Sequence, residues 1–145
     1  MTQAQSEARE LTREECLALL PTAPFGRLAF TDGALPAILP VNFVLAPDGV
    51  VLRTSAGSSV SKADGAFVAF QADVIDTERR AGWSVCVVGR ATVVRQPIAA
   101  HRLAELPLLP WVSGDRDTFV AVSLDTVSGR RIGGAEPVHQ AAAAP

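Results

Sequence analysis

The sequence predicts a mainly β fold, a small antiparallel barrel of about six strands with a few peripheral helices. Short apolar runs follow one another between turns rich in glycine, proline and aspartate, which is the pattern of consecutive strands. One run, from Gly82 to Arg95, is much longer than the others. The chain of 145 residues is long enough for one domain with a substantial core. A small barrel joined by short turns accounts for these observations.

Two segments carry helix signals. Thr12 followed by Glu15 is a capping-box pattern, and it begins a short helix that we expect Pro21 to end. Apolar side chains give this helix one buried face, so we expect it to cover one end of the barrel. A second helical segment is expected from Pro97 to about Leu106, because proline is favourable in the first turn of a helix.

Several segments have the character of strands. We expect them at residues 25–31, 36–45, 50–54, 66–74, 82–95 and 118–125. Turns at Asp32-Gly33 and at Pro47-Asp48-Gly49 join the first three into a meander. At about 3.3 Å per residue, the strand over 82–95 would exceed roughly 40 Å if it were straight, so we expect it to bend at Gly89.

The domain is expected to span residues 11–133. Residues 1–10 are polar and carry both signs of charge, and residues 134–145 contain four consecutive alanines and a terminal proline. Neither segment has a pattern that forms a core, so we expect both to be disordered. The first ten residues lack an apolar signal core, and no apolar run approaches the roughly 20 residues that cross a bilayer. We therefore expect a cytoplasmic protein.

Charge and residue usage exclude several classes of function. The net charge of −2 provides no basic field for nucleic acid, and the arginines are dispersed along the chain. Cys16 and Cys86 stand apart from each other and from any cluster around His101 or His139, so neither a zinc site nor a redox Cys-x-x-Cys motif is expected. The sequence contains no tyrosine and no Gly-x-Ser-x-Gly motif, which removes a tyrosine proton donor and the usual serine-hydrolase arrangement.

The strongest candidate for a binding site follows the third strand. There Arg53 and Thr54 end an apolar run, and the chain turns through Gly57, Ser58 and Ser59. An arginine offers a fixed fork of donors to phosphate oxygens, and hydroxyls and backbone amides supply uncharged donors beside it. This pattern predicts a ligand that carries phosphate. The alternative is an ordinary polar turn in which Arg53 pairs with a carboxylate.

Seven short motifs occur in a recognisable order along the chain. They are Gly26-Arg27-Leu28-Ala29-Phe30, Pro36-Ala37-Ile38-Leu39-Pro40-Val41-Asn42-Phe43, Leu52-Arg53-Thr54 with Gly57-Ser58, Val68-Ala69-Phe70-Gln71-Ala72-Asp73, Gly82-Trp83-Ser84-Val85 with Gly89-Arg90-Ala91, Pro110-Trp111, and Gly129-Arg130-Arg131-Ile132. With these motifs in this order, residues 11–133 resemble the pyridoxamine phosphate oxidase-like proteins, the FMN-binding split-barrel family. The resemblance implies a split β-barrel of Greek-key type, and we expect that fold here.

The resemblance also implies a homodimer with two flavin sites at the subunit interface. The matching positions are Pro40, Val41, Asn42 and Phe43 beside the isoalloxazine ring, Arg53, Thr54, Gly57 and Ser58 around the phosphate, and Trp83 and Ser84 from the other subunit. More ordinary roles stay open for two of these residues. Trp83 can be an aromatic residue at the barrel end or the dimer interface, and Asn42 can satisfy a neighbouring backbone group.

One position departs from the family pattern. Relatives commonly have Gly-Ser-Lys or Gly-Thr-Lys where this chain has Gly57-Ser58-Ser59, so a serine stands where a lysine is expected beside the phosphate. Lys62, the only lysine of the chain, follows three residues later. If the loop opens a helical turn, Lys62 lies on nearly the same face as Ser59 and can still reach an anion. Otherwise the site has one cation fewer, which leaves FMN, a deazaflavin or no cofactor open.

Three functions are compatible with the sequence. The first is a flavin-dependent oxidoreductase, in which the cofactor transfers hydride or electrons and the protein supplies orientation and polarity. The second is a binding or sensing barrel for a flavin, a deazaflavin or a tetrapyrrole such as haem, for which His101 is the internal axial candidate. The third is a dimeric interaction domain without cofactor. No residue stands out as a catalytic acid or base, and vitamin B6 oxidase activity is not expected, because only Arg130 and Arg131 could form part of a second anion site.

Overall fold

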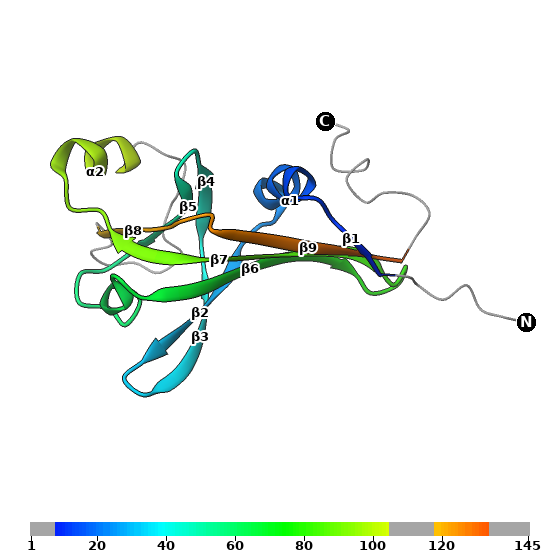
Figure 1. Ribbon diagram of the computed structural model, residues 1–145, viewed down its shortest axis with the longest axis horizontal. Helices are drawn as coiled ribbons and strands as arrows, with labels where there is room; N and C mark the ends of the chain where they lie inside the picture. Colours follow the sequence, from blue (N-terminus) through cyan, green and yellow to red (C-terminus); the bar gives the residue numbers. More distant parts are fainter. Residues whose placement is uncertain (1–7, 105–117, 134–145) are drawn as a thin grey trace, which may run out of the picture.

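The computed structural model describes residues 8–104 and 118–133 of the chain (Figure 1). Within these residues, nine strands form one sheet. The strands are β1 (Ala8–Glu10), β2 (Gly26–Asp32), β3 (Leu35–Val41), β4 (Phe43–Ala46), β5 (Gly49–Thr54), β6 (Phe67–Asp76), β7 (Ala81–Val93), β8 (Thr118–Val122) and β9 (Thr126–Ile132). The helical segments are α1 (Arg13–Leu19), η1 (Leu20–Thr22), η2 (Ser61–Ala63) and α2 (Pro97–Ala104). None of these described helices is long and apolar enough to cross a bilayer.

The sheet is antiparallel and open. Its strands follow the order β3-β2-β6-β7-β8-β5-β4, and each neighbouring pair is antiparallel. Strand β9 pairs with the first half of β7 and also with β1. The end strands β3 and β4 follow each other in sequence but do not pair along this path, so the barrel is not closed. The prediction of a mainly β, antiparallel fold is confirmed, with nine described strands instead of about six.

Strand β7 joins the two parts of the sheet. Residues Gly82 to Val88 pair with β9, whereas Ala91 to Val93 pair with β8. Between these stretches, the backbone of Gly89 passes so close to Ser123 that an added Cβ would lie 1.8 Å from the Ser123 carbonyl oxygen. Only glycine fits there without movement of the backbone. Gly89, the predicted bend, is therefore the position at which β7 changes its partner.

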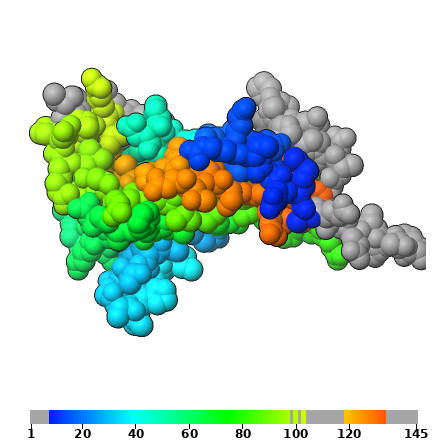
Figure 2. Space-filling view, in the orientation of Figure 1, coloured from blue at the N-terminus to red at the C-terminus, as the bar shows by residue number. Residues whose placement is uncertain are grey.

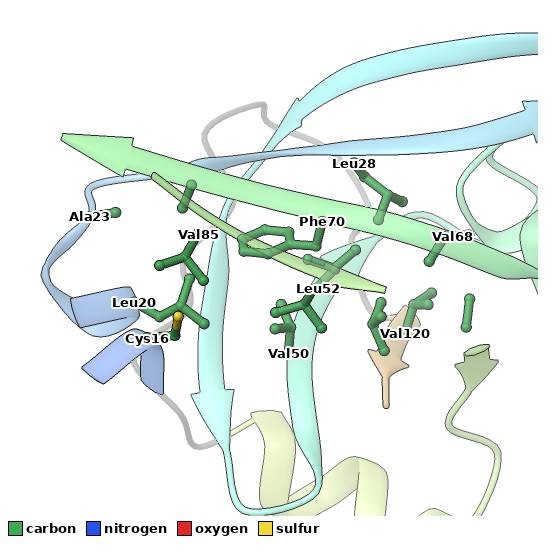
Figure 3. Close-up of a cluster of buried hydrophobic side chains, with 14 of the residues drawn as sticks. Cys16, Leu20, Ala23, Leu28, Val50, Leu52, Val68, Phe70, Val85 and Val120 are labelled. Atoms are coloured by element: carbon green, nitrogen blue, oxygen red, sulfur yellow. The ribbon is translucent and has the colours of Figure 1, made fainter. Parts of the chain in front are cut away.

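The main core lies between the parts of the sheet and under helix α1 (Figure 3). Its largest fully buried side chains are Trp83, Phe70, Leu20, Leu28 and Leu52. A smaller cluster of Val51 and Phe119 lies on the other face of β5, where Leu103 of α2 packs against it. Because successive residues of a strand point to opposite faces, β5 contributes Val50 and Leu52 to the main core and Val51 to the smaller cluster.

Three segments differ from the sequence-based expectation. Residues 8–10, expected within a disordered segment, form β1. The expected strand over 36–45 is divided at Asn42 into β3 and β4. The expected last strand ends at Val122, and a further strand, β9, follows it. All of β1 and much of β9 is exposed, so their pairing depends on backbone hydrogen bonds, which apolar patterning does not reveal.

Helix α1 begins as predicted. The Thr12 hydroxyl accepts a hydrogen bond from the Glu15 N–H at 3.1 Å, and the Glu15 carboxylate accepts one from the Thr12 N–H at 2.8 Å. The bond from the Thr12 N–H lowers the pKa of Glu15. The α-helix ends at Leu19, and Pro21 lies inside the 3-10 turn η1 that continues it, rather than at the point where helical structure stops.

The β2–β3 hairpin projects from the body of the molecule (Figures 1 and 2). Strand β3 is an end strand of the sheet and carries Pro36 and Pro40, which have no N–H to donate. Its free edge is therefore a poor template for pairing with another strand. The side chains of Leu35 and Ile38 are largely exposed on this hairpin. The hairpin can therefore contact another surface through these side chains, but only poorly by backbone pairing along β3.

Candidate anion-binding site

The end of β5 sends its last two side chains to opposite sides of the sheet. Arg53 lies directly opposite Phe119 of β8, and its guanidinium carbon is 5.3 Å from the centroid of the Phe119 ring. Thr54 lies on the side of the main core and is buried. The alternation of side chains along a strand explains this arrangement. A single ligand can therefore contact both Arg53 and Thr54 only if it binds at the end of the strand.

Ser58 organises the segment between β5 and β6, which we call the serine loop (residues 55–66). The hydroxyls of Thr54 and Ser58 are hydrogen bonded at 2.9 Å. The Ser58 hydroxyl also accepts a bond from the Ser61 N–H at 3.1 Å. The Ser58 carbonyl accepts bonds from the Ser61 hydroxyl at 2.8 Å and from the Lys62 N–H at 3.0 Å. The loop thus opens a helical turn, which is the condition under which Lys62 was expected to lie near Ser59.

The serine loop has an apolar side and a polar side. Val60 and Ala63 are buried in the main core and attach the turn to the domain. Ser59 is half-buried, and Lys62 is exposed. Gly57 has a φ of +77°, and a Cβ added there would meet nothing within 4 Å. Ser59, Lys62 and the Gly57 backbone therefore lie where a ligand could approach from solvent.

The segment from Pro40 to Phe43 lies beside the end of β5. Phe43 is directly opposite Leu52, the residue before Arg53. The ring of Phe43 packs against that of Phe70, with 4.7 Å between the centroids. Asn42 occupies the break between β3 and β4. One chain therefore brings this segment and the serine loop to the same part of the molecule.

Trp83 and Ser84 are placed elsewhere. The side chain of Trp83 is 1% exposed and belongs to the main core, so packing within the chain accounts for it. Ser84 points to the outer face of the sheet, where its hydroxyl accepts a hydrogen bond from the Gln71 amide at 3.3 Å. Ser84 is separated from Arg90, where β7 meets the end of the serine loop, by about 20 Å along the strand. Within a single subunit, Ser84 is therefore too far from the serine loop to contact the same phosphate.

Other candidate groups do not form a site in the described part of the chain. Burial raises the pKa of the thiols of Cys16 and Cys86, so both are neutral thiols and poor nucleophiles. The described residues contain no group of three side chains that could hold a metal ion. The side chain of His101, the haem-ligand candidate, lies outside the described part.

Arg130 and Arg131 do not act as a pair. Arg131 lies opposite the core residue Trp83 and is 7% exposed, and this burial lowers the pKa of its guanidinium. Arg130 is exposed and lies opposite Ser84 on the outer face. Because the two side chains leave opposite faces of β9, they do not jointly form a second anion site.

Two polar groupings were not predicted from the sequence. On the outer face, the Gln71 amide donates to Asp73 at 2.7 Å as well as to Ser84. The alternation along the predicted strand over 66–74 already placed Gln71 and Asp73 on one face, so this contact could have been found. Asp64, near the end of the serine loop, accepts a bond from the Val93 N–H, 29 residues away. No local pattern indicates that contact.

Comparisons with known proteins cover nearly the whole domain. A family model described as pyridoxamine 5′-phosphate oxidase matches residues 12–131. An uncharacterized protein of Mycobacterium tuberculosis is 43% identical over 136 residues, which are 90% of this chain and 89% of that protein. The solved structure of an FAD binding protein from Mycobacterium smegmatis is 33% identical, with a TM-score of 0.75, and the match covers 88% of this chain and 100% of that chain. A conserved protein of unknown function from Corynebacterium diphtheriae is 31% identical, with a TM-score of 0.71, over 85% of this chain and 96% of that chain.

Proposed function

Since the chain belongs to the pyridoxamine 5′-phosphate oxidase family, we propose that it binds a flavin by its phosphate at the serine loop and acts as a flavin-dependent oxidoreductase. The observation that carries this proposal is the hydroxyl cluster after β5, in which hydrogen bonds join Thr54, Ser58 and Ser61. The similarity to the FAD binding protein of Mycobacterium smegmatis supports a flavin as the ligand.

The residues present fit a phosphate group. Hydroxyls and backbone N–H groups donate to phosphate oxygens without adding charge, and Arg53 and Lys62 supply positive charge at the two ends of the segment. The open space at Gly57 lets a ligand approach the backbone closely. Ser59 adds a further hydroxyl between Ser58 and the turn. The hydrogen bonds within the cluster fix the shape of the loop, the Ser59 hydroxyl and the backbone beside Gly57 offer uncharged donors, and the two cations lie at the margins of the site.

FMN is the first candidate, because the serine loop is one compact anion site and FMN carries one phosphate. FAD is the second candidate, since the Mycobacterium smegmatis relative is an FAD binding protein. Both flavins have a phosphate at the end of the ribityl chain, so the same loop can hold either. A phosphorylated deazaflavin presents similar chemistry and is the third ligand to be tested.

The chain itself supplies binding and orientation. When bound, a flavin supplies the capacity to transfer hydride or electrons. The segment from Pro40 to Phe43 is the proposed border of the ring system, and Phe43 is held in place there by its contact with Phe70. The serine loop fixes the opposite, phosphate end. These two contacts would set the orientation of the ligand along the end of β5.

We also propose that the protein is a homodimer whose subunits meet through the outer face of the sheet. On this face, one residue from each of four neighbouring strands forms a line across the sheet, which we call the outer row. Its members are Ile38 of β3, Ala29 of β2, Ala69 of β6 and Val88 of β7. Ile38 is 67% exposed and Val88 is 38% exposed. Such a row supports burial against a second copy. Ser84 lies on the same face of β7 as Val88, so a second copy seated there would meet it.

The proposed function is tested by the colour of the purified protein. We expect flavin absorbance bands, a released ligand whose mass identifies FMN, FAD or a deazaflavin, and bleaching of the bands by NADH or NADPH. A protein that is colourless and takes up none of the three ligands would contradict the proposal. A bound flavin that neither NADH nor NADPH bleaches would favour a binding or sensing role over turnover with these donors.

A further inference from the structure

The end of the serine loop runs beside the second half of β7. The Gly65 N–H donates to the Ala91 carbonyl at 2.7 Å, and the Ala91 N–H donates to the Ala66 carbonyl at 2.9 Å. The next donor on this edge of β7 is the Val93 N–H, and it is bound by the Asp64 side chain at 2.8 Å instead of by a carbonyl. The carboxylate of Asp64 thus replaces a backbone acceptor at the point where the loop leaves the sheet.

The second oxygen of Asp64 is also occupied. It accepts a hydrogen bond from the Arg95 guanidinium at 2.8 Å, and the Asp64 side chain is 29% exposed while that of Arg95 is 69% exposed. These two bonds hold the pKa of Asp64 below its ordinary value, first through the Val93 N–H and then through Arg95. Asp64 therefore ties the loop to two positions of one short segment, residues 93–95.

The same segment supports Arg53 from its other edge. The Val94 N–H donates to the Phe119 carbonyl at 2.9 Å, and the guanidinium of Arg53 lies over the Phe119 ring. Residues 93–95 are thus bonded on one side to the end of the serine loop and on the other to the residue beneath Arg53. This short segment connects the two ends of the proposed phosphate site.

We propose that Asp64 is a positioning residue, which holds the serine loop at a fixed place relative to Arg53 by binding the Val93 N–H and Arg95. The inference rests on the proposed function, because the ligand to be positioned is the flavin phosphate. Asp64 itself does not touch the ligand. Its removal should therefore weaken phosphate recognition through loss of order in the loop.

Three substitutions separate the contacts of Asp64. Asp64→Ala removes both, whereas Asp64→Asn keeps an oxygen that can accept from the Val93 N–H and loses the ion pair. Arg95→Ala removes the ion pair alone. Each variant and the wild type would be measured in two ways: hydrogen exchange of the peptides covering residues 55–66 without ligand, and titration with FMN and with riboflavin, which lacks the phosphate.

Asp76 provides a matched control. It accepts bonds from the N–H groups of Glu78 and Arg79, both at 3.1 Å, and pairs with the Arg79 guanidinium at 3.6 Å. It therefore resembles Asp64 in having backbone donors and an arginine as partners. Asp76 lies at the opposite end of β6 from the serine loop, about 30 Å away along the strand. Asp76→Ala should change neither measurement.

We expect Asp64→Ala to speed exchange of residues 55–66 by at least about tenfold and to weaken FMN binding by roughly tenfold or more, with little change for riboflavin. Asp64→Asn and Arg95→Ala should show smaller effects of similar size to each other. Exchange and FMN affinity that match the wild type in Asp64→Ala would overturn the proposal. So would faster exchange with unchanged FMN affinity, because the loop would then need no positioning.

The two proposals fail in different ways. If the wild type binds none of FMN, FAD and the phosphorylated deazaflavin, the proposed function is contradicted, and with it any role of Asp64 in holding a flavin phosphate. The exchange rates then still decide whether Asp64 orders the loop. If the wild type binds FMN and the Asp64→Ala variant binds it equally well, the proposed function stands and the positioning role does not.

Discussion

At the scale of single residues, Ser59 is the most informative position of the serine loop. It is half-buried, adjoins the buried Val60 and stands one helical turn before the exposed Lys62. Ser59→Lys should add a cation beside the phosphate and raise FMN affinity by about tenfold, since hydrogen bonds to charged groups contribute roughly 1.5 kcal/mol or more. Flavin fluorescence titrations at low and high salt measure this change.

The salt dependence of FMN affinity and a control lysine together show whether the added charge acts at the phosphate or only through the net charge of the protein. Part of the added attraction is Coulomb energy that salt screens, so the gain in the Ser59→Lys variant should shrink at high salt. Thr77→Lys, in the exposed turn after β6, adds the same charge far from the loop and should leave FMN affinity unchanged. Equal FMN affinity of the Ser59→Lys variant and the wild type would show that Ser59 does not face the phosphate.

Asp64 gives the protein a defined pH dependence. The bonds from the Val93 N–H and from Arg95 hold the pKa of its carboxyl below the ordinary value of 3.8. A group with a lowered pKa in the folded state adds stability above the unfolded-state pKa and loses it as the pH falls through the folded-state pKa. The melting temperature of the wild type should therefore fall more steeply than that of Asp64→Asn below about pH 4. Thermal unfolding from about pH 2.5 to about pH 6 measures the difference, and a gap that stays constant over this range would contradict the assignment.

At the scale of elements, the change of partner along β7 depends on Gly89. A Cβ there would lie 1.8 Å from the backbone oxygen of Ser123, so the junction between β7 and β8 would have to move. We expect Gly89→Ala to lower the free energy of unfolding by about 1–3 kcal/mol, or to prevent folding. Gly33→Ala is the comparison, because Gly33 has a φ of +66° but open space around it. Denaturant unfolding should show the larger loss for Gly89→Ala, and an equal or smaller loss would count against the close contact.

The elements that were predicted are those with a local signal. Thr12 and Glu15 form the capping box, the turn at Pro47-Asp48-Gly49 joins β4 to β5, and Gly89 marks the junction in β7. The split barrel inferred from the order of motifs is confirmed by the family match and by the structure from Mycobacterium smegmatis. Strands β1 and β9 were missed because they are held by backbone pairing and present mostly exposed side chains.

In the candidate site, as in the fold, the sequence indicated the features that depend on neighbouring residues and not those that depend on distant ones. A helical turn between Ser58 and Lys62 was one of two possibilities that the sequence left open, and the hydrogen bonds of Ser58 show that it forms. The separation of Arg53 and Thr54 to opposite faces follows from strand alternation alone. The contact of Asp64 with Val93 could not be predicted, because it depends on how the loop and β7 meet after folding. Non-local contacts of this kind leave no pattern in the sequence.

At the scale of the whole molecule, the proposed homodimer is tested through the outer row. We expect the wild type to sediment at micromolar concentration as a dimer of the 15.2 kDa chain. Ile38→Asp combined with Val88→Asp places two charges in the outer row and should give a folded monomer, because burying unpaired charges in an interface is unfavourable. Ala18→Asp, on the exposed side of α1, is the control and should remain dimeric. A monomeric wild type, or a double variant that stays dimeric, would contradict the proposed interface.

The central claim, that the serine loop recognises a flavin phosphate, is tested most directly by comparing FMN with riboflavin on the ligand-free wild-type protein. The two ligands differ only in the phosphate, so the ratio of their affinities isolates its recognition. We expect FMN to bind roughly ten- to a hundredfold more tightly than riboflavin, and Arg53→Ala to reduce this ratio, because charge-assisted hydrogen bonds contribute about 1.5–3 kcal/mol. Equal affinity for FMN and riboflavin would show that the serine loop is an ordinary turn.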